Sequence, residues 1–299
     1  MTGSGHIYCS DIAKEHGVPL IGSATTGDVW FLLEFSGRYE SKAFEGSKIP
    51  EEVKAYLKGI QPEGLKPRIL MIQQAESRSR EGIHLFVGLT DAQNPRLYQY
   101  ELQQYEDILK LDLARLAAGG GDPDHVRKEP LFLVCTNGKR DMCCARFGPT
   151  VYGELSGTFG DSVWQSSHIG GHNKAPNMLF FPFGVNYGRA TPEDAIHLAT
   201  DFSMGRLELN NLRGRVCYPL PVQAAEHFWR VETGVLELPG MEVVSVEEVG
   251  ADEWRVAIRG ADGSEPRWIG VRREESEQVV QVSCVPGKDR PVVSFHRVR

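Results

Sequence analysis

The chain has 299 residues, of which 41% are hydrophobic and 24% are charged, and its formal net charge is -7 with a pI near 5.8. A chain of this length can bury a substantial core without disulfide bonds. Its acidic balance, with no long lysine or arginine run, excludes a typical nucleic-acid-binding protein. Because neither a signal-peptide pattern nor a run of about 18 apolar residues occurs, we expect a cytoplasmic protein that does not bind a membrane.

The first third of the chain alternates strand and helix patterns in the order β-α-β-β-β-α. Its predicted strands lie at 29–35, 68–74, 83–89 and 96–102, and its predicted helices at 49–60 and 105–118. The helix at 49–60 has Pro50 in its first turn, a favoured position for proline. The turn-forming run GGGDPD at 119–124 then predicts a boundary between two units.

The second unit repeats this order. Its predicted strands lie at 130–135, 162–168, 178–184 and 185–190, and its predicted helices at 148–157 and 191–207. Pro149 suits the first turn of the earlier helix, and Thr191 with Asp194 forms a capping-box pattern at the start of the later one. The repeat indicates a tandem duplication.

The tail changes to an alternating pattern with Gly-, Asp- and Pro-containing turns, which is typical of an antiparallel sheet. The predicted fold is therefore α/β. It comprises an N-terminal unit at 1–120, a second unit that carries the chemistry at 125–230, and a β-rich C-terminal segment at 235–299.

The stretch CTNGKRDMCCARFG holds Cys135, Cys143 and Cys144. In a reducing cytosol, closely spaced cysteines are more often metal ligands or redox thiols than disulfides. Downstream, HIGGH supplies His168 and His172 around two glycines, which favour a tight loop. Two thiols and two imidazoles suit either tetrahedral zinc or a 2Fe-2S cluster, and their spacing does not choose between these.

Three stretches carry a resemblance to a known family: CTNGKRDMCCARFG, HIGGHNKAPNMLFFPFGVNYGRATPEDA and GRVCYPLPVQAAEH. Together they resemble the sucrase/ferredoxin-like family, whose core is similar to thioredoxin-like 2Fe-2S ferredoxins. The resemblance covers most of 1–230. It implies a thioredoxin-like fold for 125–215, so we expect two tandem thioredoxin-like units.

The resemblance also implies the cluster ligands. The cysteines would bind one iron and the histidines the other, in the set Cys135, Cys144, His168 and His172. On the family's Cys-x8-Cys spacing, Cys143 is a bystander. The remaining cysteines, Cys9, Cys217 and Cys284, are expected to be packing residues or exposed bystanders.

Several further residues are candidates for tuning the centre. The cationic loop residues Lys139, Arg140 and Arg146 either are simply solvated or dock an acidic redox partner. Residues expected to lie around the ligands include Gly171, Asn177, Tyr187 and Arg189. No catalytic residue is predicted.

The leading hypothesis is an electron-transfer protein with Rieske-like ligands and proton-coupled redox chemistry, which receives electrons from a separate reductase. One alternative is a thiol-dependent oxidoreductase that uses Cys143 and Cys144. Another is an interaction module with a structural zinc ion. The sequence does not indicate the oligomeric state.

Overall fold

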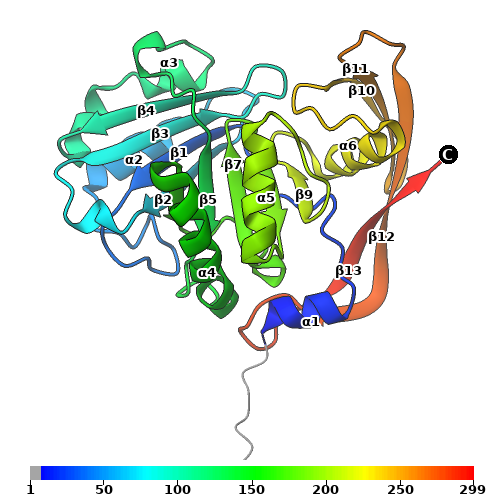
Figure 1. Cartoon of the computed structure of the whole chain (residues 1–299), viewed down its shortest axis with the longest axis horizontal. Helices are drawn as coiled ribbons and strands as arrows, with labels where there is room; N and C mark the ends of the chain where they lie inside the picture. The colour runs from blue at the N-terminus through cyan, green and yellow to red at the C-terminus, as the bar shows by residue number, and fades with distance from the viewer. Residues whose placement is uncertain (1–7) are drawn as a thin grey trace, which may run out of the picture.

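The computed structural model describes residues 8–299, so the first seven residues of the predicted N-terminal unit lie outside it. Nine strands lie between residues 29 and 215. They are β1 (Val29–Glu34), β2 (Pro67–Gln73), β3 (Ile83–Leu89), β4 (Arg96–Leu102), β5 (Leu131–Cys135), β6 (Val163–Ser166), β7 (Asn177–Phe181), β8 (Val185–Gly188) and β9 (Leu212–Arg215). They form one curled mixed sheet of order β4-β3-β1-β2-β6-β5-β7-β8-β9 (Figure 1).

The two halves of this sheet repeat the same pairing. β1 pairs in parallel with β2 and antiparallel with β3, which pairs with β4. β5 likewise pairs in parallel with β6 and antiparallel with β7, which pairs with β8. An antiparallel contact between β2 and β6, where Ile72 faces Ser166, joins the halves. Both predicted units therefore contribute to one continuous sheet.

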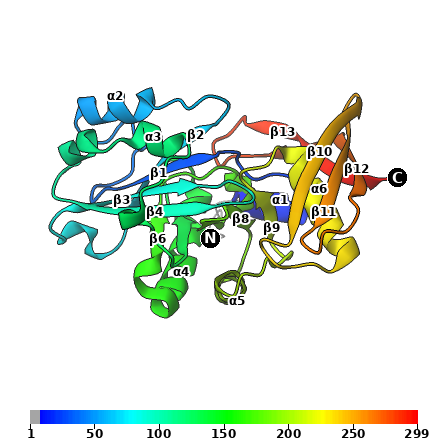
Figure 2. The same ribbon diagram turned by 90° about the horizontal axis from the view of Figure 1, so that it is seen from above.

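The α-helices are α1 (Cys9–Glu15), α2 (Glu51–Gly59), α3 (Leu113–Ala117), α4 (Met142–Phe159), α5 (Pro192–Ser203) and α6 (Leu220–Thr233). Figure 2 shows α2 and α3 on one side of the sheet and α4 and α5 on the other. Each pair covers its own apolar core, which includes Val53 and Leu116 on the first side and Val151 and Leu198 on the second. None of the helices within residues 8–299 is long and apolar enough to cross a membrane.

Local contacts explain where the helices begin. At α5, Thr191 Oγ1 accepts the N–H of Asp194 at 3.1 Å and the Asp194 carboxylate accepts the N–H of Thr191 at 2.9 Å, which confirms the predicted capping box. The predicted start of α4 near Pro149 was wrong, because the helix already begins at Met142. Its N-cap is Asp141, whose side chain accepts the N–H of Cys143 at 3.0 Å.

The predicted helix at 105–118 was also wrong as one element. It divides into a 3-10 helix, Tyr105–Lys110, and the short helix α3. The hydroxyl of Tyr56 enters the break, where it contacts the carbonyl of Leu111 and accepts the N–H of Leu113 at 3.3 Å. Asp112 then caps the new helix.

The C-terminal segment forms the predicted antiparallel sheet, separate from the first. Its strands are β10 (Met241–Gly250), β11 (Glu253–Gly260), β12 (Arg267–Gln281) and β13 (Asp289–Val298). β12 is a single long strand, and its pairing with β13 is irregular between Glu275 and Val279. α6 packs on this sheet through Trp229 against a core that includes Ile269.

Candidate metal centre

The two predicted cysteine ligands lie between a strand end and a helix start. Cys135 is the last residue of β5, a fully buried strand, and Cys144 lies in the first turn of α4. A Cβ at Gly148 would collide with the carbonyl oxygen of Cys135, so this glycine allows α4 to approach the strand closely. The positive end of the α4 dipole favours the thiolate form of cysteines in its first turn.

The two predicted histidine ligands lie side by side in a glycine loop. The ring centroids of His168 and His172 are 5.0 Å apart. Gly170 and Gly171 have φ angles of 116° and 72°, which other residues rarely adopt, and this agrees with the predicted tight loop. The Nδ1 atoms of both histidines are buried and have no hydrogen-bond partner among residues 8–299.

The structure brings the four predicted ligands together, three of them tightly. Ligand atoms of Cys135, Cys144 and His168 lie within 4.8 Å of one another. His172 lies next to His168 but outside this group, and its Nε2 is 3.8 Å from Asp141 Oδ2. The donor set fits a metal centre, because buried polar atoms without partners are rare unless an unseen ligand satisfies them.

The protonation of Cys135 and His172 also suits metal binding. A hydrogen bond shared with Cys144 holds the pKa of Cys135 well below its usual value and raises that of Cys144. Burial lowers the pKa of His172, although Asp141 opposes the shift. Thiolate and neutral imidazole are the forms that bind metals.

Sequence analysis missed Arg213, the buried residue that holds the histidine loop. Its guanidinium donates to the carbonyl of Gly170 at 2.9 Å and to Asn177 Oδ1 at 2.6 Å. It also donates to Ser23 Oγ at 3.2 Å and contacts the carbonyl oxygen of Ser23. Burial lowers the pKa of Arg213 to about 9, while the nearby Cys135 and Cys144 favour its charged form. No pattern in the sequence distinguishes it from a surface arginine.

Of the residues expected around the ligands, Asn177 contacts the histidine loop directly and Gly171 is part of it. Asn177 Nδ2 donates to the carbonyl of Gly171 at 2.9 Å. A Cβ at Gly171 would lie 2.5 Å from the Arg213 guanidinium, so only glycine fits there without a shift. Arg189 lies beyond this loop and donates to the carbonyls of Val18 at 2.7 Å and Asn173 at 3.4 Å.

The other expected residues lie elsewhere. Tyr187 packs against Phe180 in the core beneath α4 and α5, with ring centroids 5.3 Å apart. Lys139 is exposed, and Arg146 is exposed with its guanidinium 5.9 Å from the ring centroid of Phe147.

The adjacent cysteines belong to different groups of side chains. Cys143 Sγ lies 3.4 Å from Cys9 Sγ and 3.3 Å from Cys284 Sγ, and these three sulfurs and an Asp141 oxygen lie within 4.8 Å of one another. Cys9 and Cys143 are fully buried, and Cys284 is partly buried. The sequence did not indicate that they meet Cys284, because these cysteines are far apart along the chain.

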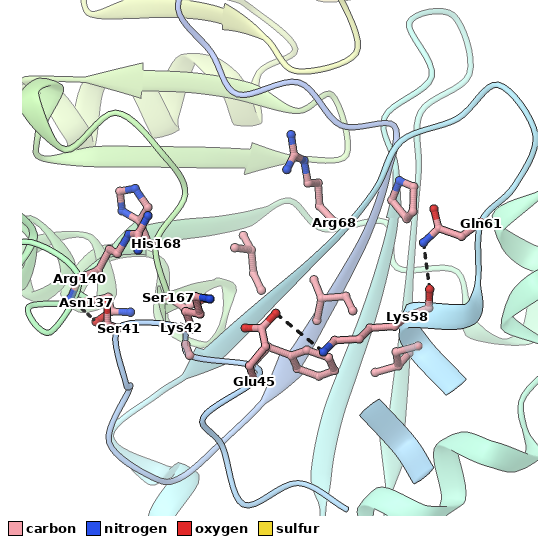
Figure 3. A pocket seen from close by; sticks show the side chains of 16 residues that line it. Ser41, Lys42, Glu45, Lys58, Gln61, Arg68, Asn137, Arg140, Ser167 and His168 are labelled. Atoms are coloured by element: carbon pink, nitrogen blue, oxygen red, sulfur yellow. Dashed lines mark hydrogen bonds and ion pairs between the residues drawn. The ribbon is translucent and has the colours of Figure 1, made fainter. Parts of the chain in front are cut away.

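A cavity of about 560 Å³ adjoins the centre at His168. Figure 3 shows His168, Asn137 and Arg140 at one end of it, Gln61 at the other, and the ion pair of Lys58 with Glu45 between them. Its other charged lining residues are Lys42 and Arg68. The walls therefore carry more positive than negative charge.

The family model for sucrase/ferredoxin-like proteins matches residues 20–214, which is more than half of the chain and includes all four predicted ligands. The chain belongs to the sucrase/ferredoxin-like family. This confirms the resemblance at the level of the family.

Similar proteins include two that are both named "Altered inheritance of mitochondria protein 32". The one from Meyerozyma guilliermondii is 31% identical over 99 residues, which cover 29% of this chain and 35% of the relative. The one from Debaryomyces hansenii is 31% identical over 97 residues, which cover 29% and 36%. The match thus spans about a third of each relative. No solved structure matches this member of the sucrase/ferredoxin-like family.

Proposed function

We propose that this protein transfers electrons through one 2Fe-2S cluster held by Cys135, Cys144, His168 and His172. The observation that carries the proposal is the meeting of two buried thiols with two imidazoles whose Nδ1 atoms have no partner among the described residues. Membership in the sucrase/ferredoxin-like family favours iron-sulfur chemistry at such a donor set. When bound, the cluster would accept and donate one electron.

We further propose that each half of the nine-stranded sheet is a thioredoxin-like unit, and that only the second holds a metal. The repeated pairing of β1 to β4 and of β5 to β8 supports this. In the first half, Glu34 ends β1 at the place where Cys135 ends β5. Its carboxylate is used in contacts with Arg80 and His84.

The mixed ligand set would raise the reduction potential. Imidazole is neutral where thiolate is anionic, so two histidines reduce the negative charge at the site. Rieske centres, which have the same ligand types, span roughly -150 to +300 mV, against about -400 mV for plant-type ferredoxins. We expect a potential between these classes.

His172 would also link the electron to a proton. With its Nδ1 as the ligand, its Nε2 would carry the proton, 3.8 Å from Asp141 Oδ2. The carboxylate favours the protonated ring. Electron uptake should therefore draw in a proton, and the potential should fall by up to about 59 mV per pH unit. Redox titrations monitored by visible absorption at several pH values measure this slope, and a flat potential would refute the coupling.

The cavity beside His168 would receive an acidic redox partner, such as a separate reductase. Lys42, Arg68 and Arg140 supply positive charge there, although the whole chain is acidic. Electron transfer with such a partner should slow as ionic strength rises, because 0.1 M salt largely screens the attraction between exposed charges that are more than about 10 Å apart.

Paired serine variants test the ligand assignment. Cys144→Ser should abolish the visible absorption of the cluster, whereas Cys143→Ser should retain it because its sulfur lies among Cys9 and Cys284. Both variants replace a fully buried thiol in the same helical turn, so each controls for the other. Loss of the cluster in Cys143→Ser alone would overturn the assignment.

A single zinc ion is the second candidate for this site. Three ligand atoms within 4.8 Å of one another also suit one tetrahedral ion. A colourless protein with stoichiometric zinc lost in Cys144→Ser would favour it. The thiol-oxidoreductase alternative has less support, because Cys143 and Cys144 are both fully buried and face different groups.

A further inference from the structure

We propose that the protein has a second metal site, in which Cys9, Cys143, Cys284 and Asp141 bind a structural zinc ion. The site lies beyond the proposed cluster and does not depend on it. Its thiols come from three distant parts of the chain: the first turn of α1, the first turn of α4 and the loop between β12 and β13. Figure 1 shows α1 beside the end of the sheet where β12 turns into β13.

The sulfur positions suit one tetrahedral ion. Cys143 Sγ lies 3.4 Å from Cys9 Sγ and 3.3 Å from Cys284 Sγ. A disulfide would need about 2.05 Å between two sulfurs and would leave the third thiol unused. Zinc–sulfur bonds of about 2.3 Å in a tetrahedron place sulfurs about 3.8 Å apart. The observed spacing is therefore within about half an ångström of that needed, so a small outward shift of the sulfurs would admit one ion.

Backbone amides donate to two of the three sulfurs. The N–H of Ser10 donates to Cys143 Sγ at 3.4 Å, and the N–H of Cys9 donates to Cys284 Sγ at 3.5 Å. Hydrogen bonds from amides to an anionic acceptor strengthen as its charge develops. Zinc binding would release the thiol protons, and the ion would then compensate the buried negative charge.

Asp141 is placed to supply the fourth ligand through Oδ1. Its Oδ2 already accepts Ser283 Oγ at 2.9 Å and the N–H of Cys284 at 2.9 Å. Oδ1 accepts the N–H of Cys143 at 3.0 Å and the thiol of Cys9 at 3.9 Å. Oδ1 thus already faces the sulfurs, and zinc would take the place of the Cys9 thiol proton there. The same carboxylate neighbours His172, so it links this site to the proposed cluster.

Ligand type and burial specify the ion and its role. Three thiolates exclude calcium and magnesium, which require oxygen ligands, and favour zinc. Cys9, Cys143 and the Asp141 side chain are fully buried, so four protein ligands would close the site to substrate. The ion would tie both ends of the chain to the cysteine loop, because Cys9 and Cys284 are 275 residues apart. Closing so long a loop gives a large entropic stabilisation.

Metal analysis of variants tests the proposal. Anaerobically purified protein should contain about one zinc per chain, and Cys9→Ser and Cys284→Ser should each lose at least about nine-tenths of it. Cys217→Ser removes a partly buried cysteine outside the site and should keep the zinc. Cys135→Ser should also keep zinc while losing iron. Iron content thus tests the proposed function separately from the zinc site.

A measurement on the unmodified protein covers the case in which a variant does not fold. Removing zinc with a chelator should lower the melting temperature, and adding one equivalent of zinc should restore it. The proposal is overturned by a zinc-free protein that takes up none in competition with a chelator. It is equally overturned by zinc that is lost in Cys135→Ser but kept in Cys284→Ser, or by a Cys9–Cys143 or Cys143–Cys284 disulfide in a non-reducing peptide map.

Discussion

Replacing Arg213 with glutamine should both destabilise the protein and disorder the proposed cluster site. The buried guanidinium donates to the carbonyl of Gly170 and to Asn177 Oδ1, and it contacts the carbonyl oxygen of Ser23. A shorter neutral side chain leaves these acceptors without their charged donor. Because Gly170 and Asn177 hold the histidine loop, iron should be lost along with stability.

The magnitude follows from the groups left behind. Each buried acceptor without a partner costs about 1–3 kcal/mol, so three cost about 3–9 kcal/mol. Relief from burying a cation offsets part of this, since burial, together with the charge of nearby Arg189, lowers the pKa of Arg213 to about 9. We therefore expect a net loss of about 3–5 kcal/mol, which is a large fraction of the 5–15 kcal/mol typical of folded domains.

Urea denaturation followed by tryptophan fluorescence measures the change. The matched control is Arg206→Gln, because the Arg206 side chain is half-exposed and its Nε lies 3.8 Å from Asp201 Oδ1. This control should change stability by less than about 1 kcal/mol. A loss below about 1 kcal/mol in Arg213→Gln, with iron retained, would refute the role assigned to Arg213.

Two further predictions concern other parts of the fold. Gly148→Ala should lower stability by about 1–3 kcal/mol and reduce metal content, because the added Cβ would collide with the carbonyl of Cys135. The control is Gly153→Ala, in the same helix with open space around it, which should stabilise the protein by up to about 1 kcal/mol. Equal effects of the two substitutions on the urea midpoint would contradict this. Burial raises the pKa of Glu34, but hydrogen bonds from His84 and Ser77 and the charge of Arg80 outweigh it and bring the pKa below its ordinary 4.5. A carboxyl group whose pKa is lower in the folded than in the unfolded protein stabilises the fold above the unfolded pKa, and this stability is lost as the pH falls through the folded pKa. The urea concentration at the unfolding midpoint should therefore decrease as the pH falls below about 4.5. Glu34→Gln should flatten this acid slope, exposed Glu81→Gln should not, and an unchanged slope in Glu34→Gln would count against the assignment.

Local patterns were sufficient for most of the secondary structure. The apolar run before Cys135 predicted β5, and Thr191 with Asp194 predicted the start of α5. Each of these signals lies within a few neighbouring residues, where local geometry determines the outcome. The start of α4 was misjudged because proline suits a first turn, whereas Asp141 provides a stronger cap further upstream.

Long-range contacts were not predictable in this way. The four proposed cluster ligands could be predicted because they occur in two short motifs and resemble those of a known family. Arg213 and the pairing of Cys9 with Cys284 have no local signature, since their partners come from other parts of the chain. Tyr56 likewise interrupts the predicted helix at 105–118, although it lies far from that helix in the sequence.

The central claim is that Cys135, Cys144, His168 and His172 hold an iron-sulfur cluster. Its most direct test is iron and acid-labile sulfide analysis of anaerobically purified protein, combined with electron paramagnetic resonance after reduction with dithionite. The account predicts about two irons and two sulfides per chain and a rhombic signal from one reduced 2Fe-2S centre, all lost in Cys144→Ser. A protein without iron or sulfide, in which zinc occupies these four ligands, would contradict it.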